Sequence, residues 1–560
     1  MSNNHSSLAI GQPRFNDAGL ADTARTHGAL AAWKSAFGQQ GAHAARQVSG
    51  DFAVGHRDDS GRVFLAVDRF AIRTLCYRVV GRELHFAERA DALVDGQPEI
   101  DAQAIFDYLY FHAIPSPRTI FKGVFRVPPG HCVLFDAGRL TVAPYWVPEF
   151  TEPAGDVSFP ALKAEFLAVL RSAVAQQLDG SKPACFLSGG TDSSTVAGMI
   201  RQASGGPAAS YSIGFAAEGY DEMEFARIAA RHFGTEHHEY YVTPADLVRS
   251  IGDVAASYDQ PFGNSSALPS YYCAKFARDD GVRKILAGDG GDELFGGNSR
   301  YAKQRVFGWY QQLPAGLRSG LLEPLLEAPL AARLPLLRKG ASYIEQAKVP
   351  MPERLQMYNL LRRLGADTVL TPDFLARIDQ ADPARQQRAV WDQAHASTEL
   401  DRTLAFDWRY TLAESDLPKV CGTTRLAGVA VGFPFLEAVM LDFSMRLPGD
   451  YKLKRLKLRW FFKEALRGFL PDQIISKKKQ GFGLPFGVWA TRDAPLKKLA
   501  VDSLASLSTR GIVRPDFITQ LVNAYLPSHP GYYGELVWIL MMLEQWMQRH
   551  APQFKVAHLP

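Results

Sequence analysis

Helical patterns and short apolar runs alternate along the chain from Ser158 onward, and this alternation limits the fold more than any other feature of the sequence. The expected helices cover residues 159–177, 222–233 and 244–257, and the expected strands cover residues 183–187, 209–215, 238–242 and 284–287. Strands that are joined through helices run parallel, so we expect an α/β domain with a parallel sheet. Beyond residue 300 the pattern is mostly helical.

The first expected strand runs into a glycine-rich loop, residues 188–193, that reads Ser-Gly-Gly-Thr-Asp-Ser and opens a helix. Backbone N–H groups at such a helix start bind anions, so phosphate is the expected ligand. Asp192 adds a carboxylate that suits Mg²⁺ held between the protein and phosphates. The loop has neither the lysine of a Walker A motif nor the spacing of GxGxxG. An ordinary Gly-Ser turn is the alternative.

A second loop of glycines and acids, residues 288–297, follows the expected strand at 284–287. Ligands bind beyond the carboxyl ends of strands in open α/β sheets, which places this loop where a site is expected. Its carboxylates, Asp289, Asp292 and Glu293, could supply a metal ligand and a base. A solvated acidic turn is the alternative, and the presence of the first loop argues against it.

Residues 1 to about 150 show short apolar runs between Gly, Pro and Asp turns, which predicts a strand-rich region. Residues 52–56 and 63–67 read as one hairpin, and a linker rich in Pro, Glu and Gly follows around 148–157. A length of 560 residues is too great for one core and indicates two or three domains.

Bulk properties exclude several classes of protein. The net charge of +4 is small for this length and gives no indication of a nucleic-acid partner. The five cysteines are scattered and form no CxxC pair, as in a protein without a disulfide framework or zinc site. The sequence has no signal-peptide pattern and no uncharged apolar run long enough for membrane insertion. We therefore expect a cytoplasmic enzyme.

Together the two loops resemble those of the asparagine synthetase family, and further motifs follow in order along nearly the whole chain. Residues 211–215, Tyr-Ser-Ile-Gly-Phe, resemble the strand whose backbone receives adenine. Residues 259–269 resemble the family's D-E-P-F…SS-A-x-P segment, with Gln260 in place of the usual Glu. Residues 479–483 resemble the segment that carries the catalytic lysine. Asp68-Arg69 and residues 128–131 resemble the family's glutaminase-like domain.

The resemblance implies an α/β synthetase domain over residues 158–555, with an adenine-nucleotide alpha-hydrolase-like parallel sheet and added helices. It also implies a truncated, β-rich Ntn-glutaminase-like domain over residues 1–150. The implied reaction adenylates a carboxylate with ATP, releases pyrophosphate, and lets an amine displace AMP. The implied cofactors are therefore ATP and Mg²⁺.

The resemblance also implies a role for each matching residue. ATP would be bound by residues of both loops and of the adenine strand, namely Leu187, Ser188, Gly189, Gly190, Asp192, Ser193, Ile213, Gly214 and Gly288. Mg²⁺ would be bound by Asp192 and Asp292. Asp289 would act on the incoming amine, and Lys479 would neutralise charge on the adenylate and pyrophosphate. The nearby basic residues are expected to form a solvated face: Lys452, Lys454, Arg455, Lys457, Arg459, Lys477 and Lys478.

The sequence departs from the family pattern in two places. A glutamine-hydrolysing member carries a cysteine directly after the initiator methionine, whereas Ser2 follows Met1 here. Between residues 420 and 437 the usual charged pairs are replaced by Cys421-Gly422 and by Ala430 and Gly432. We therefore expect no glutamine hydrolysis, and free aspartate becomes a less convincing substrate.

Relatives that combine an adenylating site with a defunct glutaminase include β-lactam synthetases and the cyclases that close lasso-peptide macrolactam rings. The leading hypothesis is macrolactam closure in a ribosomal peptide precursor, with a peptide or small carboxylate as substrate and a leader protease or recognition protein as partner. One alternative is an asparagine synthetase that uses ammonia or glutamine nitrogen. The other is a nucleotide-binding pseudoenzyme that serves as a scaffold.

Overall fold

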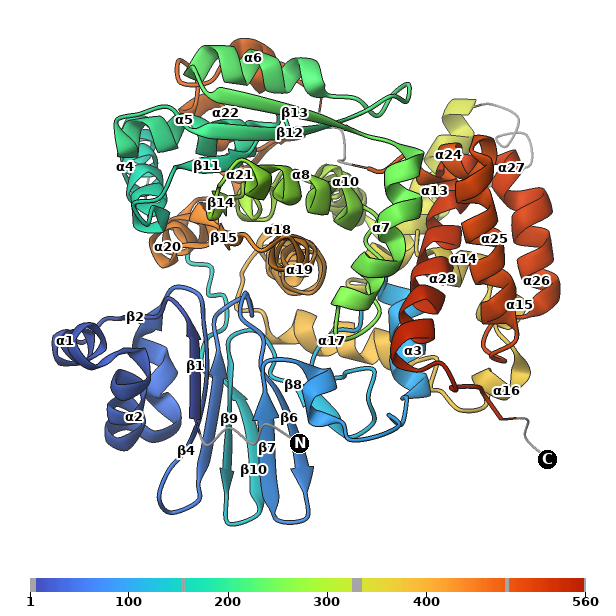
Figure 1. The fold of residues 1–560 in the computed structure, drawn as a ribbon. Helices are drawn as coiled ribbons and strands as arrows, with labels where there is room; N and C mark the ends of the chain where they lie inside the picture. Colours follow the sequence, from blue (N-terminus) through green and yellow to red (C-terminus); the bar gives the residue numbers. More distant parts are fainter. Residues whose placement is uncertain (1–6, 154, 156, 325–334, 479–482, 558–560) are drawn as a thin grey trace.

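The computed structural model of the chain describes residues 7–153, 155, 157–324, 335–478 and 483–557. Two antiparallel sheets of the N-terminal region lie at one end of the molecule, and a parallel sheet surrounded by helices lies at the other (Figure 1). This arrangement confirms the predicted fold class, an α/β part joined to a β-rich N-terminal region.

The parallel sheet has five strands in the order β13–β12–β11–β14–β15. Its strands are β11 (Ala184–Phe186), β12 (Ala209–Phe215), β13 (Glu236–Val242), β14 (Lys284–Leu286) and β15 (Ala430–Gly432). The helices that precede or connect them are α4 (Phe159–Gln177), α5 (Thr191–Ser204), α6 (Met223–Phe233), α7 (Pro244–Ser257) and α8 (Ala267–Asp279). Four of the strands and four of these helices were predicted, whereas β15 was not.

The order of the strands decides where the site lies. After β11 the chain continues to β12 on one side, and β14 pairs with β11 on the other side. The strand order therefore reverses at β11, and the loops that follow β11 and β14 leave the sheet side by side. Such a reversal opens the crevice in which α/β sheets bind their ligands.

The N-terminal region packs two sheets against each other. The larger sheet is β1 (Ser7–Gly11), β4 (Phe52–Arg57), β5 (Val63–Val67), β9 (His131–Asp136) and β10 (Arg139–Pro144), and the smaller is β7 (Glu83–Ala87), β6 (Cys76–Val80) and β8 (Val124–Arg126). Alternate residues of β4 and β5 point to opposite faces, so Leu65 packs toward Phe86 of the smaller sheet while Phe64 packs toward Trp33.

Three helices in this region were not predicted: α1 (Ala18–His27), α2 (Ala29–Gln40) and α3 (Ala102–Phe111). The Asp17 side chain caps α1 by accepting from the Leu20 N–H, and the Asp101 side chain caps α3. In α2 the buried residues Trp33, Ala36 and Phe37 recur at helical spacing. The prediction of a strand-rich region overlooked this helical periodicity.

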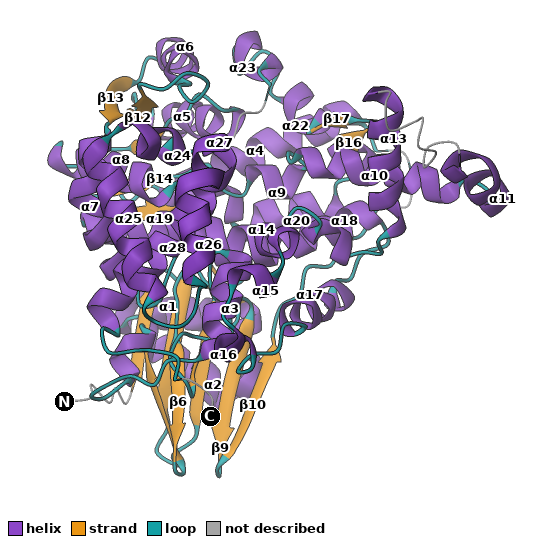
Figure 2. Ribbon diagram, turned by 90° about the vertical axis from the view of Figure 1, so that its right-hand side faces the viewer, coloured by secondary structure: helices purple, strands orange, loops and turns teal. Residues whose placement is uncertain are grey.

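Helices dominate the rest of the chain (Figure 2). The longer ones are α10 (Ser299–Gln312), α13 (Pro335–Lys348), α17 (Asp382–Gln393), α18 (Glu399–Asp407), α19 (Leu417–Ala427), α20 (Ala438–Arg446), α24 (Phe486–Arg492), α25 (Ala494–Ser508) and α28 (Pro530–His550). Short helices α9 (Gly291–Phe295) and α22 (Trp460–Ala465) flank the site described below. The apolar helix α28 is buried among α7, α24 and α25. In the part of the chain that the structure describes, no helix is long and apolar enough to cross a membrane.

Buried contacts join the N-terminal region to the α/β part. The Arg126 guanidinium lies 3.0 Å from Asp259 Oδ1. The other carboxylate oxygen, Asp259 Oδ2, accepts a hydrogen bond from the Ala90 N–H at 2.9 Å. Burial alone would raise the pKa of Asp259, but Arg126, the Ala90 N–H and Arg89 together outweigh burial and lower it. Trp146 stacks on Trp408 with 6.3 Å between ring centres. The two parts therefore share one continuous interior.

The prediction of a solvated basic face is wrong for three residues. Lys452 is fully buried, and its ammonium lies 2.7 Å from a carboxylate oxygen of Asp401. Arg459 is 5% exposed, and Lys477 pairs with Glu222 at 2.7 Å. The remaining four, Lys454, Arg455, Lys457 and Lys478, are exposed as predicted. Charge density in the sequence did not distinguish the buried cations because each partner is far away along the chain.

Replacement of Lys452 by methionine should destabilise the fold, because it leaves the Asp401 carboxylate buried without its counter-ion. Loss of one partner of a buried pair costs about 3–5 kcal/mol. We expect lower midpoints of thermal and urea unfolding for Lys452→Met, and no comparable change for Lys457→Met at a nearby exposed lysine. Equal midpoints for the two variants would show that the buried pair does not stabilise the protein.

Candidate active site

The two glycine-rich loops are in direct contact, as the order of the strands requires. A Cβ atom on Gly288 would lie 2.9 Å from the backbone nitrogen of Ser193, and one on Gly291 would overlap with the Asp192 carboxylate. Glycine is therefore needed at both positions for the loops to approach. The structure thus brings together residues that lie about a hundred positions apart in the sequence.

The first loop is shaped to receive an anion. The Ser188 N–H donates to the Ser193 hydroxyl at 3.1 Å, which folds the loop over the start of α5. Gly189 has φ +72°, and a Cβ there would overlap with the backbone of Ala226. No side chain caps the start of α5 at Gly190, so the first N–H groups of the helix are available to a ligand.

The predicted adenine strand, β12, lies beside the first loop. The Leu187 N–H donates to the carbonyl of Tyr211 at 2.9 Å, and the Ser212 hydroxyl donates to the carbonyl of Leu187. A Cβ on Gly214 would lie 2.5 Å from the ring of Tyr241, so the ring packs directly against the strand at this position and only glycine fits there. The structure therefore places Ile213 and Gly214 at the same edge of the sheet as the loop.

The two predicted metal ligands meet at one arginine. A single guanidinium nitrogen, Arg459 Nη1, lies 2.8 Å from Asp192 Oδ2 and 2.8 Å from Asp292 Oδ1, and it also donates to Thr191 Oγ1 at 3.0 Å. The second nitrogen, Nη2, bonds the other oxygen of Asp192. Burial would lower the pKa of Arg459, but the two carboxylates outweigh burial and raise it. Arg459 therefore remains charged in the site.

The donor set fits Mg²⁺ bound together with ATP. Asp192 and Asp292 offer carboxylate oxygens, the ligand type that Mg²⁺ prefers. Among the described residues no group of three or more His, Cys, Asp or Glu side chains is placed to hold a metal ion. Two carboxylates beside a phosphate-binding loop suit an ion that keeps several waters and takes its remaining ligands from phosphate.

The predicted amine-activating residue, Asp289, belongs to a second charged cluster. Its Oδ1 lies 3.6 Å from Lys419 Nζ, and Lys419 Nζ lies 3.1 Å from Asp416 Oδ1. Burial raises the pKa of Asp289, and Lys419 opposes this rise. Burial would lower the pKa of Lys419, but Asp416 and Asp289 raise it. Lys419 was not among the predicted site residues. The predicted catalytic lysine, Lys479, lies outside the described residues.

A large cavity begins at this cluster. Asp416 is one of the residues that line a cavity of about 620 Å³, which lies between α3, α28 and the helices around residues 355–416. Its wall is rich in aromatic side chains: Tyr110, Phe111, Tyr358, Tyr410 and Tyr532. Charged groups, among them Arg300, Glu414 and Glu535, also line it. The volume lies within the range of about 300–1,000 Å³ typical of small-molecule sites.

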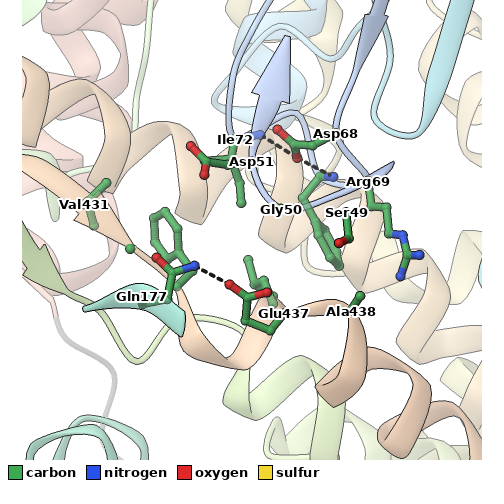
Figure 3. A pocket seen from close by; sticks show the side chains of 14 residues that line it. Ser49, Gly50, Asp51, Asp68, Arg69, Ile72, Gln177, Val431, Glu437 and Ala438 are labelled. Atoms are coloured by element: carbon green, nitrogen blue, oxygen red, sulfur yellow. Dashed lines mark hydrogen bonds between the residues drawn. The ribbon is translucent and has the colours of Figure 1, made fainter. Parts of the chain in front are cut away.

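Two smaller pockets lie between the N-terminal region and the α/β part. Figure 3 shows the narrower one, of about 20 Å³, where Gln177 donates to Glu437 and Asp68 accepts from the Ile72 N–H at 3.1 Å. Burial raises the pKa of Asp68 to about 6. The Asp68 carboxylate accepts four backbone N–H bonds, three of them from residues 70–73, so the Asp68-Arg69 motif shapes a turn.

The wider of the two pockets measures about 210 Å³ and is lined by the segment that departs from the family pattern. Cys421, Gly422, Thr424, Ala430 and Val431 all contribute to its wall. A Cβ on Gly422 would overlap with the ring of Tyr258. The altered segment thus faces the N-terminal region at these positions, whereas Lys419, at the start of the same helix, faces Asp289.

The cysteines of this sequence are unsuited to nucleophilic attack. Burial raises the pKa of Cys76, Cys185 and Cys421 to about 12 each. Burial also raises the pKa of Cys132 and Cys273. The thiolate is the reactive form of cysteine, and these five thiols are protonated at neutral pH.

Comparisons with known proteins place these features in context. Residues 165–548 match the family model described as asparagine synthase, and residues 21–146 match the one described as glutamine amidotransferase domain. Asparagine synthetase [glutamine-hydrolyzing] 1 of Bacillus subtilis is 23% identical over 504 residues, which cover 88% of this chain and 77% of that protein. Amidase chyE of Penicillium rubens is 24% identical over 498 residues, which cover 79% and 70%.

Glu535, in the wall of the large cavity, should make stability depend on pH. Burial raises its pKa from 4.5 to about 7. Between these values the folded protein binds more protons than the unfolded chain, so the free energy of unfolding falls as pH rises through this window. The free energy of unfolding of Glu535→Gln should exceed that of the wild type by up to about 3 kcal/mol at pH 8 and should equal it near pH 4.

The measurement is a series of urea unfolding midpoints between pH 4 and 8 for the wild type, Glu535→Gln and the control Glu345→Gln. Glu345 is exposed, so its replacement should leave the pH profile unchanged. A constant difference between wild type and Glu535→Gln at every pH would contradict the assignment of a buried, protonated carboxyl to the cavity wall.

Proposed function

The chain belongs to the asparagine synthase family of ATP-dependent carbon–nitrogen ligases, and we propose that it joins a carboxyl group and an amine of one peptide into a macrolactam. The observation that supports this substrate class is the cavity of about 620 Å³ that begins at Asp416, beside Lys419 and Asp289. Free aspartate would fill only a small part of it. A folded peptide segment, with apolar side chains against the aromatic wall, suits its size and lining.

In the proposed first step the substrate carboxylate attacks the α-phosphorus of ATP. An acyl–adenylate forms, the bond between the α- and β-phosphates breaks, and pyrophosphate leaves. The N–H groups around Ser188 to Ser193 would hold the departing pyrophosphate, and Asp192 and Asp292 would hold Mg²⁺. Bound Mg²⁺ supplies positive charge against the phosphate oxygens.

In the proposed second step the amine attacks the activated acyl carbon and AMP leaves. The peptide has then lost one water, while ATP has become AMP and pyrophosphate. An ammonium group must first give up a proton, and in this proposal Asp289 accepts it. A carboxylate with a raised pKa is a stronger base than an ordinary one, and Lys419, which opposes the rise in the pKa of Asp289, favours the ionised form that can accept a proton.

The amine in this proposal belongs to the substrate, so the reaction needs no ammonia. Burial raises the pKa of all five cysteines, so these thiols are poor nucleophiles for releasing ammonia from glutamine. This agrees with an amine that the substrate itself supplies. A peptide precursor would be the substrate, and a leader protease or a recognition protein would be the partner.

Synthesis of asparagine is the second candidate, because several relatives are named asparagine synthetase. Release of pyrophosphate that depends on aspartate together with ammonium or glutamine would favour it. Absence of pyrophosphate with every substrate would instead favour a nucleotide-binding scaffold.

The decisive experiment supplies Mg²⁺, ATP and synthetic peptides that carry an internal Asp or Glu and a free N-terminal amine. The expected product has lost the mass of one water, and the same peptides acetylated at the N-terminus should remain unchanged. Production of free asparagine from aspartate and ammonium, with no change in any peptide, would overturn the proposal.

Replacement of Asp289 by asparagine should separate the two steps. The rate of adenylation, measured as ATP–pyrophosphate exchange, should change little because Asp289 lies outside the carboxylate pair that would hold Mg²⁺. Ring closure should slow by about 100-fold or more, the usual contribution of a general base. Asp292→Asn serves as the comparison and should impair both steps. Equal losses in both steps for Asp289→Asn would reject its assignment to the amine.

A further inference from the structure

We propose that Arg459 is a positioning residue that occupies the metal-binding side of Asp192 and Asp292 until Mg²⁺ arrives together with ATP. In this role it keeps the two loops in register and excludes free divalent ions from the site. The proposal rests on the use of Mg²⁺-ATP by the site and is independent of which carboxylate is activated.

The position of Arg459 supports a dedicated role. It directly precedes α22 and adopts φ 54° and ψ 36°, a left-handed conformation that costs free energy for a residue other than glycine. The side chain is buried, and its guanidinium lies 4.0 Å from the centre of the Phe462 ring. Among the five basic residues between 452 and 459, this is the one whose charge reaches both loops.

The charges of the site explain why a cation is needed before the nucleotide binds. Asp192 and Asp292 come from different loops, and two carboxylates so close together repel each other. The Arg459 guanidinium bonds both and reduces their combined charge from −2 to −1. Removal of the Arg459 side chain would take away the guanidinium that bridges the two carboxylates, so their repulsion should increase and the loops should separate or recruit a metal ion.

The same contacts determine which ion can compete. Free Mg²⁺ gives up its water reluctantly and would have to displace a guanidinium that already bonds both carboxylates. Mg²⁺ bound to ATP brings phosphate oxygens as well, and these offer the displaced guanidinium new acceptors. The buried Nε of Arg459 has no acceptor among the described residues, which leaves one donor to be satisfied by such a ligand. Exchange is therefore favourable with the nucleotide and unfavourable without it.

The test measures binding of Mn²⁺, as a probe for Mg²⁺, by calorimetry in the absence of nucleotide. Wild type and the control Lys457→Gln should show weak or undetectable binding, because Lys457 is exposed and the bridge is intact in both. Arg459→Gln should bind Mn²⁺ at least tenfold more tightly. Addition of Mg²⁺ should also raise the thermal unfolding midpoint of Arg459→Gln and leave that of wild type unchanged.

Arg459→Lys provides a second variant in case Arg459→Gln does not fold. Lysine keeps the positive charge but cannot bridge two carboxylates as a planar guanidinium does, so its affinity for Mn²⁺ should lie between those of wild type and Arg459→Gln. Affinities for Mn²⁺ in the variants that equal that of wild type would overturn the proposal. Because neither measurement uses a substrate or nucleotide, failure here differs from failure of the proposed ring closure.

Discussion

Contact between two loops that follow neighbouring parallel strands is the constraint on which the site depends. β11 and β14 are adjacent, so the carboxylates of Asp192 and Asp292 must share one small space. Glycines at 288 and 291 make the approach sterically feasible, and Arg459 makes it electrostatically feasible. The close approach of the two carboxylates thus depends on the strand order, on the glycines of the loops and on a cation from a distant part of the chain.

The N-terminal region extends this arrangement instead of standing apart from it. Arg126 and Asp259 form a buried pair across the boundary, and α3 donates a hydrogen bond from Tyr108 to the carbonyl of Ile539 on α28 at 2.8 Å. Both α3 and α28 contribute to the wall of the large cavity. A region that resembles a glutaminase domain therefore serves here as part of the frame around the site.

The sequence predicted the parts of the fold that are encoded locally. Apolar runs at 209–215 and periodic helices at 159–177 and 244–257 appear in the structure as β12, α4 and α7. β15 has three residues and carries no signal of its own, and the helices near the N-terminus were overlooked despite their periodicity. In the site, glycine spacing indicated both loops, whereas the roles of Lys419 and Arg459 depend on partners more than a hundred residues away. No local pattern could reveal such pairs.

The glycines around the carboxylates also limit what this centre can become. A side chain on Gly291 would overlap with Asp192, and one on Gly297 would overlap with Asp292. A third acidic ligand therefore cannot be added at either position without moving the backbone of both loops. Substitutions at these two glycines therefore cannot build the carboxylate-rich, two-ion centre found in nucleases and polymerases. Side chains in the walls of the cavity can change without disturbing the two loops, so we expect relatives with different substrates to differ there.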